Sequence, residues 1–364
     1  MVNVQNFTIK DFESILAKTE DRNIVCFCAG QAFLTICDRY PLLVGKVLYI
    51  VDNYIESSWL EVKGRIIPIR KMEQIGEEVK EKILLICSLK FADELVQQMD
   101  QIPVLEQCNV YIPNLFVNDS RMKFVPSSNP VRIPKKIHYC WFGHGEMPKQ
   151  FKDNIETWKK FCPEYEIVRW DESNYDISKN EYMRQAYEMK KWGFVPDYAR
   201  LDIVYEHGGI YLDTDVELVR SLDELLKYKL FCGFESMDYV AFGLGFGAQK
   251  NHPILKHMME EYDKEKFILE DGTLNLVASP VYQTRVLEKY GLKKNGHMQE
   301  YADFVVFPTE CFAPVNAYGV GYPKSNTFSI HQYAATWFDE SQKKHKERII
   351  KSCKYLVDRL NSDQ

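Results

Sequence analysis

The stretch VPDYARLDIVYEHGGIYLDTDVE, residues 195–217, combines the pattern of a helix, a break and a short strand. It predicts a helix over 196–207, which Gly208-Gly209 ends because glycine readily takes the left-handed conformation of a helix C-cap. Apolar residues 210–212 then predict a strand that leads into Asp213-Thr-Asp215. Ligands of α/β sheets bind at the carboxyl ends of strands, so we expect a binding site at these two aspartates.

Two carboxylates at positions i and i+2 of an extended backbone point to the same side. Asp213 and Asp215 could therefore share one divalent cation, for which hard oxygen ligands favour Mg²⁺ or Mn²⁺, or divide between a cation and a hydroxyl. Asp197 and Arg200 share one face of the preceding helix. Such a pair can bind a sugar hydroxyl and phosphate oxygens, or it can be a surface ion pair of little energetic value.

Composition sets broad limits on the protein. The 364 residues suggest about two domains, and 46% hydrophobic with 27% charged residues is an ordinary globular balance. A net charge of −6 argues against nonspecific nucleic-acid binding but leaves open a local basic patch at a membrane surface. The sequence contains no apolar stretch typical of a signal peptide or a membrane span, and its ten cysteines form no CxxC pair. We therefore expect reduced thiols and a cytoplasmic location.

The first part of the chain predicts a parallel α/β sheet covered by helices on both faces, with apolar strands near 23–30, 46–52, 64–69, 82–87 and 108–112. Gly30 and Asp52 resemble a dinucleotide-binding arrangement, but the turn has one glycine of the usual three and Phe33 stands at the third position. We interpret residues 1–128 as a Rossmann-like accessory domain for partner contacts or a homo-oligomer. The Pro- and Ser-rich stretch 114–134 is the expected linker.

Residues 129–364 form the second predicted domain, a mixed sheet flanked by helices. A strand is expected within 133–143 and another over 166–170. Further helices are expected over 149–160 and 180–192, and a charged amphipathic helix over 340–360.

The whole pattern D-x-x-R…G-G-x-Y-x-D-x-D of residues 197–215 resembles the sugar-binding region of glycosyltransferase family 32, and the glucosylating clostridial toxins share it. Other matching segments are IPKKIHYCWFG (133–143), FGAQKNHPIL (246–255), NLVASPVYQT (275–284) and SIHQYAATW (329–337). Ser279 departs from the family's glycine. The terminal motif keeps one histidine of two, His331, and Thr336 replaces a serine. The resemblance spans about residues 131–340.

The resemblance implies a GT-A type domain that transfers a sugar with retention of configuration from a nucleoside diphosphate donor. It assigns Asp197, Arg200, Asp213 and Asp215 to catalysis. Trp141 would stack on the uracil of the donor, while Tyr211 would contact the donor or pack in the core. A Mn²⁺ or Mg²⁺ ion would be held by Asp215 and Asp213, with His331 or Thr336 completing its shell. Thr336 and Trp337 would belong to the segment that closes over the pyrophosphate.

We expect an enzyme that builds a bacterial capsule, O-antigen or lipopolysaccharide on a glycan or lipid-linked oligosaccharide acceptor, at the inner face of the plasma membrane. UDP-galactose is the first expected donor; UDP-glucose, UDP-N-acetylhexosamines and GDP-mannose stay open. The alternatives are an oxidoreductase or other nucleotide-sugar-modifying enzyme that uses residues 1–115, and a noncatalytic sugar-nucleotide-binding scaffold. A toxin-like transferase acting on host proteins is the fourth hypothesis.

Overall fold

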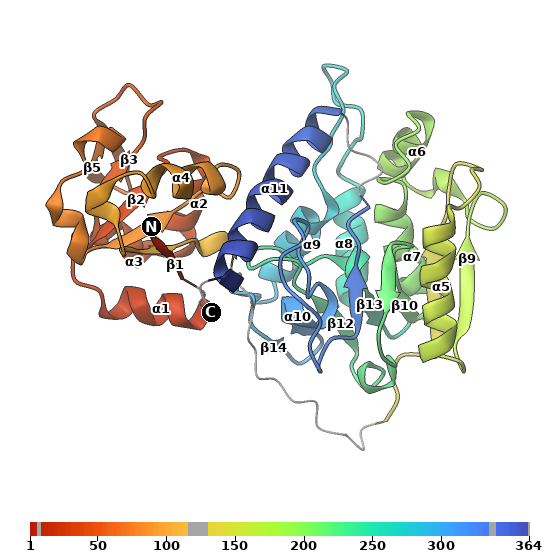
Figure 1. Ribbon diagram of the computed structural model, residues 1–364. Coiled ribbons are helices and arrows are strands. Elements are labelled where there is room, and N and C mark those ends of the chain that lie inside the picture. Colours follow the sequence, from red (N-terminus) through yellow and green to blue (C-terminus); the bar gives the residue numbers. More distant parts are fainter. Residues whose placement is uncertain (6–8, 116–129, 335–339, 363–364) are drawn as a thin grey trace. The chain divides into compact units, whose positions relative to one another are not determined.

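The computed structural model describes residues 1–5, 9–115, 130–334 and 340–362, which fold into two compact units (Figure 1). Unit 1 comprises residues 1–119, 318–320 and 339–364, and unit 2 comprises residues 120–317 and 321–338. The predicted second domain, 129–364, therefore needs a correction, because its C-terminal helix belongs to unit 1.

Unit 1 contains a seven-stranded sheet in which only the edge strand β4 runs antiparallel to its neighbour. From β2 the order continues through β3 and β5 on one side and through β6 and β7 on the other, which is the order of doubly wound sheets. All five predicted strands are confirmed; the short edge strands β1 and β4 were missed. The strands in spatial order are β1 (Asn3–Val4), β7 (Asn109–Tyr111), β6 (Ile83–Ile86), β2 (Ile24–Phe27), β3 (Val47–Val51), β5 (Arg65–Arg70) and β4 (Trp59–Val62).

The helices of unit 1 include a long C-terminal one, α11, that packs against α4 and β1. Its apolar face buries Ile349, Cys353 and Leu356 in the same core as Val96 and Met99 of α4. Burial of this face explains the amphipathic pattern of residues 340–360. The α-helices are α1 (Ile9–Lys18), α2 (Gln31–Arg39), α3 (Pro41–Lys46), α4 (Ala92–Met99) and α11 (Glu340–Ser362).

Two arginines of α11 fix it to the first part of the chain. Arg348 forms a fork with Asp93, at 3.0 Å and 2.7 Å, and contacts Glu94 at 2.7 Å. Arg359 donates to Asp100 and to the carbonyl of Val2. Because paired charges in a partly buried setting favour one geometry, these contacts define where the helix lies.

Replacing Arg348 with alanine should therefore destabilise unit 1 by about 2–3 kcal/mol, because it leaves the nearly buried Asp93 carboxylate without its main partner. Amide hydrogen exchange of the β6 segment, followed by mass spectrometry, would measure the loss. Lys351→Ala, at an exposed position of the same helix, is the matched control. Equal protection in both variants would contradict this role for Arg348.

The same pair predicts a pH dependence. Burial alone would raise the pKa of Asp93, but hydrogen bonds from Arg348 and from the backbone of Glu94 lower it below its ordinary value of 3.8. The pair therefore makes its full contribution to the free energy of unfolding above the ordinary pKa of 3.8. This contribution is lost as the pH falls through the lowered pKa of the folded state. The Arg348→Ala variant should lack this acid-dependent component of stability.

Unit 2 is built on a mixed seven-stranded sheet, as predicted. The pairs β8–β9, β8–β10 and β12–β15 are parallel, and β10–β13, β12–β13 and β14–β15 are antiparallel. The strands in spatial order are β14 (Gln299–Glu300), β15 (Val305–Phe307), β12 (Leu230–Gly233), β13 (Phe246–Ala248), β10 (Gly209–Tyr211), β8 (Lys136–Cys140) and β9 (Glu166–Trp170).

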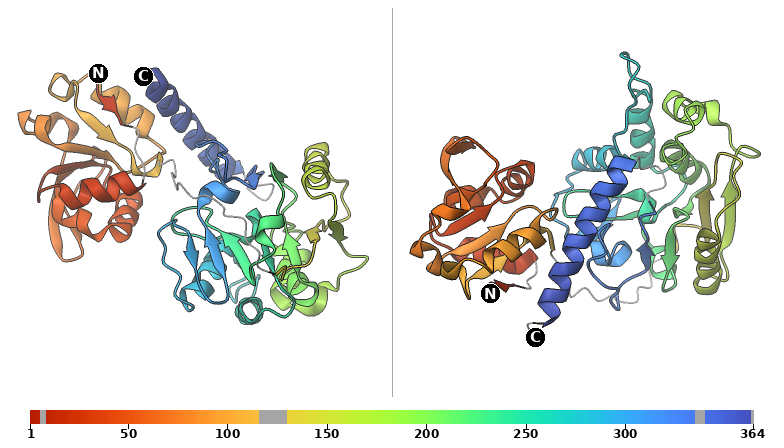
Figure 2. Two further views of the ribbon diagram at one scale, coloured as in Figure 1. Left: turned by 90° about the horizontal axis from the view of Figure 1, so that it is seen from below. Right: turned by 45° about the horizontal axis from the view of Figure 1, so that its top comes forward.

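Helices cover both faces of this sheet (Figures 1 and 2). Side chains of α6 to α9 share one buried cluster, and those of α5 and α10 share another. The helix predicted over 196–207 is confirmed, whereas the one expected over 180–192 ends at Glu188. The bounds are α5 (Lys149–Phe161), α6 (Glu181–Glu188), α7 (Pro196–His207), α8 (Pro253–Tyr262), α9 (Ser279–Glu288) and α10 (Thr309–Phe312).

A second, two-stranded sheet in unit 2 pairs β11 (Val216–Leu218) with β16 (Ser329–His331) in antiparallel register. The register places His331 opposite Val216, the residue after Asp215. Segments more than 110 residues apart in the chain therefore meet at the predicted aspartates. Within the described part of the chain, no helix combines the length and apolar character needed to span a bilayer.

Candidate active site

The turn between α7 and β10 brings the chain to the site. Gly208 and Gly209 have φ angles of +63° and +113°, which confirms that glycine is needed there. A Cβ on Gly209 would lie 2.9 Å from the His138 ring on β8, so only glycine lets β10 pair closely with β8 at this point. After Tyr211 the chain leaves the sheet at the carboxyl end of β10 and continues into Asp213-Thr-Asp215.

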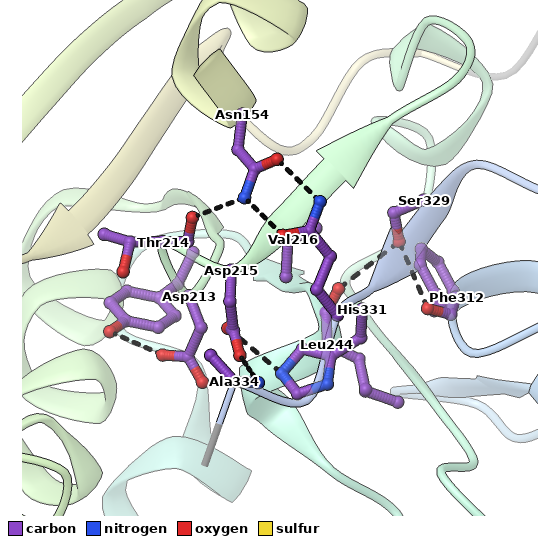
Figure 3. Close-up of polar contacts among 12 residues, drawn as sticks. Asn154, Asp213, Thr214, Asp215, Val216, Leu244, Phe312, Ser329, His331 and Ala334 are labelled. Carbon is purple, nitrogen blue, oxygen red and sulfur yellow. Dashed lines mark hydrogen bonds and ion pairs between the residues drawn. The ribbon is translucent and has the colours of Figure 1, made fainter. Parts of the chain in front are cut away.

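Asp213, Asp215 and His331 form a compact group whose oxygen and nitrogen atoms lie within 4.8 Å of one another. His331 Nε2 is 3.2 Å from Asp215 Oδ1, and the amide of Ala334 donates to Asp215 Oδ2 at 3.0 Å (Figure 3). The Gln332 amide donates to the Asp215 carbonyl, which fixes the crossing of the two segments. The sequence named all three residues of this candidate metal-binding group, and the binding of a metal by them stays a prediction.

Asp197 and Arg200 lie beside this group and are almost fully buried. Arg200 Nη2 donates to Asp197 Oδ1 at 2.6 Å, and its Nη1 lies 3.6 Å from Asp213 Oδ2. Their side chains are only 6% and 5% exposed, so a surface ion pair was the wrong alternative. Burial raises the pKa of Asp197 to about 6, although Arg200 opposes the shift.

Tyr211 joins the core to the site. Its ring is buried beside Phe246, and its hydroxyl donates to Asp213 Oδ1 at 3.0 Å. Tyr211 therefore packs in the core and orients Asp213, which combines the packing hypothesis with a role in the site. A contact between Tyr211 and a donor stays a prediction.

The pKa values of Asp213, Asp215 and His331 differ from those of isolated side chains. Burial would raise the pKa of Asp215, but the adjacent His331 lowers it overall. Burial would lower the pKa of His331, but Asp215, Asp213 and Glu235 raise it overall. Burial also raises the pKa of Asp213, against the opposing field of Arg200. The arrangement thus stabilises an ion pair between His331 and Asp215.

The donor set fits a divalent cation. Two carboxylates and an imidazole are ligands that Mn²⁺ accepts, and the carboxylates also suit Mg²⁺. His331 Nδ1 is buried and has no hydrogen-bond partner among the described residues, so one ring nitrogen remains available. The carboxylates of Asp213 and Asp215 can each offer an oxygen to the same point. The identity of the metal stays a prediction.

Of the predicted donor residues that the structure describes, Trp141 is not a member of this group. Trp141 follows β8, packs on Phe151 and donates its indole N–H to the carbonyl of Gly145 at 2.7 Å. Its ring is partly buried, and stacking on a uracil stays a prediction. Thr336 and Trp337 lie outside the described residues.

Residues of the segment 240–244 were missed by sequence reasoning, although they complete the site. A Cβ on Gly243 would overlap Asp213 Oδ2 and lie 3.1 Å from Arg200 Nη1, so glycine is required for this close approach. Gln283 Oε1 accepts the Phe242 amide at 2.9 Å and thereby holds the segment in place. The glycine-rich run FGLGFG was the one signal in the sequence.

Helix α9 also contributes to the surroundings of Asp197. Ser279 lowers the pKa of Asp197, against the larger effect of burial, which raises it. The departure from the family's glycine at position 279 therefore adds a polar partner to the site.

In unit 1, Asp52 stands where a dinucleotide-binding domain has its ribose-binding carboxylate, but here it accepts hydrogen bonds from backbone amides. Its Oδ2 accepts the Ala29 amide at 3.0 Å, and its Oδ1 accepts the amides of Tyr54 and Ile55. These bonds occupy the carboxylate that would bind a ribose in a dinucleotide site. Phe33 is fully buried where a third glycine would stand. Both observations favour an accessory role for this unit.

Comparison with known proteins gives matches to a family model, to curated proteins and to solved structures. Residues 148–232 match a family model described as a glycosyltransferase sugar-binding region containing a DXD motif. Inositol phosphoceramide mannosyltransferase 3 of Schizosaccharomyces pombe is 30% identical over 161 residues, covering 42% of this chain and 44% of that protein. A mannosyl phosphorylinositol ceramide synthase of Saccharomyces cerevisiae is 31% identical over 146 residues, covering 38% of each chain.

The chain thus spans less than half the length of these curated relatives. Among solved structures, the PaToxG glycosyltransferase matches with a TM-score of 0.35 and 18% identity, covering 44% of this chain and 72% of that one. A likeness at this level does not establish a shared fold. The family match lies on α5 to β12 and includes Asp197, Arg200, Asp213 and Asp215. Residues 148–232 therefore contain a glycosyltransferase sugar-binding region with a DXD motif.

Proposed function

We propose that this protein is a metal-dependent glycosyltransferase that moves a hexose from a nucleotide sugar to a glycan or lipid acceptor. The observation that carries the proposal is the group of Asp213, Asp215 and His331 beside the buried Asp197–Arg200 pair. A buried guanidinium and a cation-binding group together form a site for a diphosphate, whose charge grows as the sugar leaves.

Asp213, Asp215 and His331 would hold the divalent cation, which supplies positive charge to the leaving diphosphate. Arg200 adds a fixed positive charge and stays charged throughout, because its pKa is far above neutrality. Asp197 accepts a hydroxyl hydrogen of the transferred sugar while Arg200 keeps it oriented. Tyr211 and Gly243 hold Asp213 in one orientation, so the site requires little reorganisation on reaction.

The substrates follow from two lines of support. Trp141, which the resemblance to glycosyltransferase family 32 would stack on a uracil, favours a UDP-sugar, with UDP-galactose first. The same resemblance favours retention of configuration. The relatives are named as mannosyltransferases of inositol phosphoceramide, which adds GDP-mannose and a lipid-bound acceptor. Synthesis of a bacterial surface polysaccharide at the inner face of the plasma membrane is the proposed setting.

Nucleotide release from a panel of UDP- and GDP-sugars, with Mn²⁺ and with EDTA, tests the proposal. We expect slow hydrolysis of one donor that stops with EDTA and returns with excess Mn²⁺. His331→Ala should weaken Mn²⁺ binding about 10- to 100-fold, whereas His345→Ala, at an exposed position of α11, should not. If neither nucleotide release nor calorimetric binding of any donor occurs with Mn²⁺, the noncatalytic scaffold becomes the better reading.

A further inference from the structure

Strand β11 has β16 along one edge and helix α5 along the other. On the α5 side, three side chains of the helix bond the backbone of residues 214–218, as a third strand would. Their positions at i, i+3 and i+4 place them on one face of the helix. The bonds run from Asn154 Nδ2 to the Thr214 carbonyl (2.9 Å), from Trp158 Nε1 to the Val216 carbonyl (2.8 Å) and from the Leu218 amide to Thr157 Oγ1 (2.9 Å).

Asn154 also bonds the opposite segment, which carries His331 (Figure 3). Its Oδ1 accepts from Gln332 Nε2 at 3.0 Å and its Nδ2 donates to Gln332 Oε1 at 3.3 Å, so the two side-chain amides pair reciprocally. The backbone amide of Gln332 donates in addition to the Asp215 carbonyl at 2.9 Å. The pair therefore ties the carbonyls of Thr214 and Asp215 to the residue that follows His331.

The amide of Asn154 is engaged at every position that it offers. Its two N–H groups donate to Thr214 and Gln332, its oxygen accepts from Gln332, and the residue is only 3% exposed. A buried amide left without its partners costs about 1–3 kcal/mol, so the pair strongly favours the one arrangement in which both segments meet. Because a cation site works only when its ligands lie within about 0.5 Å of their places, such a constraint matters most beside metal ligands.

We infer that Asn154 and Gln332 are positioning residues of the metal-binding group. Their paired amides hold the segment that carries His331 against the segment that carries the two aspartates, so that all three ligands meet at one cation. The inference rests on the metal-dependent function proposed above. Each amide acts through the backbone next to a ligand, as the outer partners of a metal site do.

The probe is Mn²⁺, titrated by calorimetry into the full chain with and without UDP. Asn154→Ala and Gln332→Ala should each raise the Kd of Mn²⁺ about 10- to 100-fold. Both substitutions remove the same amide pair, so the double variant should lose little more affinity than either single variant. The exchange variant, Asn154→Gln with Gln332→Asn, rebuilds an amide pair of the same total length and should recover most of the lost affinity.

Thr157→Val is the matched control for a merely structural role. It removes a bond between α5 and β11 at Leu218, three residues beyond Asp215. The variant should lower the melting temperature, as Asn154→Ala does, because it leaves a backbone amide without its acceptor. Its Kd for Mn²⁺ should equal that of the wild type.

Unchanged Mn²⁺ affinity in both alanine variants would overturn the inference, and so would an equal loss of affinity in Thr157→Val. If Asn154→Ala does not fold, Gln332→Ala decides, because the Gln332 side chain is only half-buried. A wild-type chain that binds no Mn²⁺, with or without UDP, would also overturn the inference. Nucleotide release is measured separately: if no donor is turned over while the Kd of Mn²⁺ shifts as expected, the proposed function fails and the positioning role stands.

Discussion

Asp215→Asn should lower sugar transfer on the order of 10³-fold while the fold stays intact. The substitution removes one negative charge from the metal-binding group and leaves His331 with a neutral neighbour. Asparagine has nearly the same shape, and its side-chain oxygen can still accept the Ala334 amide. The loss should therefore appear in catalysis and metal affinity rather than in packing.

The measurement is nucleotide release with the preferred donor, together with calorimetric titration of Mn²⁺ and circular dichroism of the variant. Glu217→Gln, two residues further along the chain on β11, removes a carboxylate outside the metal-binding group and is the matched control. Near-normal turnover of Asp215→Asn would remove Asp215 from the catalytic assignment. A variant that fails to fold would instead be recognised by its lost dichroism.

Gly243→Ala is expected to reduce transfer about 100-fold through a single added methyl group. The new Cβ would collide with Asp213 Oδ2 and press on Arg200, so one of these groups has to leave its position. Because φ at Gly243 is not in the left-handed region, the backbone itself tolerates alanine. The effect therefore reports on the orientation of Asp213 rather than on strain in the chain.

Steady-state kinetics and Mn²⁺ titration of Gly243→Ala measure this displacement. Gly30→Ala serves as the control, since no atom lies within 4 Å of its added Cβ and its φ of −80° suits alanine. Equal activity of the two variants would show that Asp213 has room to move without cost.

The sequence predicted those parts of the fold that depend on residues close together in the chain. The apolar runs of unit 1 predicted β2 and β6 because these strands are buried on both faces. Helix α7 was predicted at its observed bounds because Gly208 ends it by a local backbone requirement. The roles suggested for Asp213 and Asp215 came from a long motif with fixed spacing, and the role of His331 came from the separate segment 329–337.

The parts that sequence missed depend on contacts between distant segments. The run FGLGFG indicates a need for glycine around Gly243 but does not indicate that Gly243 approaches Asp213. Contacts with α9 and the β11–β16 pair create the proximity of these distant segments. The amphipathic pattern of residues 340–360 predicted a helix but not its partner. The buried apolar face of the helix and the contacts of Arg348 and Arg359 show that it belongs to unit 1.

The division of unit 1 between the two ends of the chain has a consequence during synthesis. Its sheet emerges from the ribosome early, whereas α11 follows only after residues 120–338 have been made. At about 5–20 residues per second, this interval lasts on the order of ten to forty seconds. Throughout it, the apolar surface around Val96 and Met99 lacks the cover that Leu356 provides. During synthesis, unit 1 therefore exposes a defined apolar face until α11 has been made.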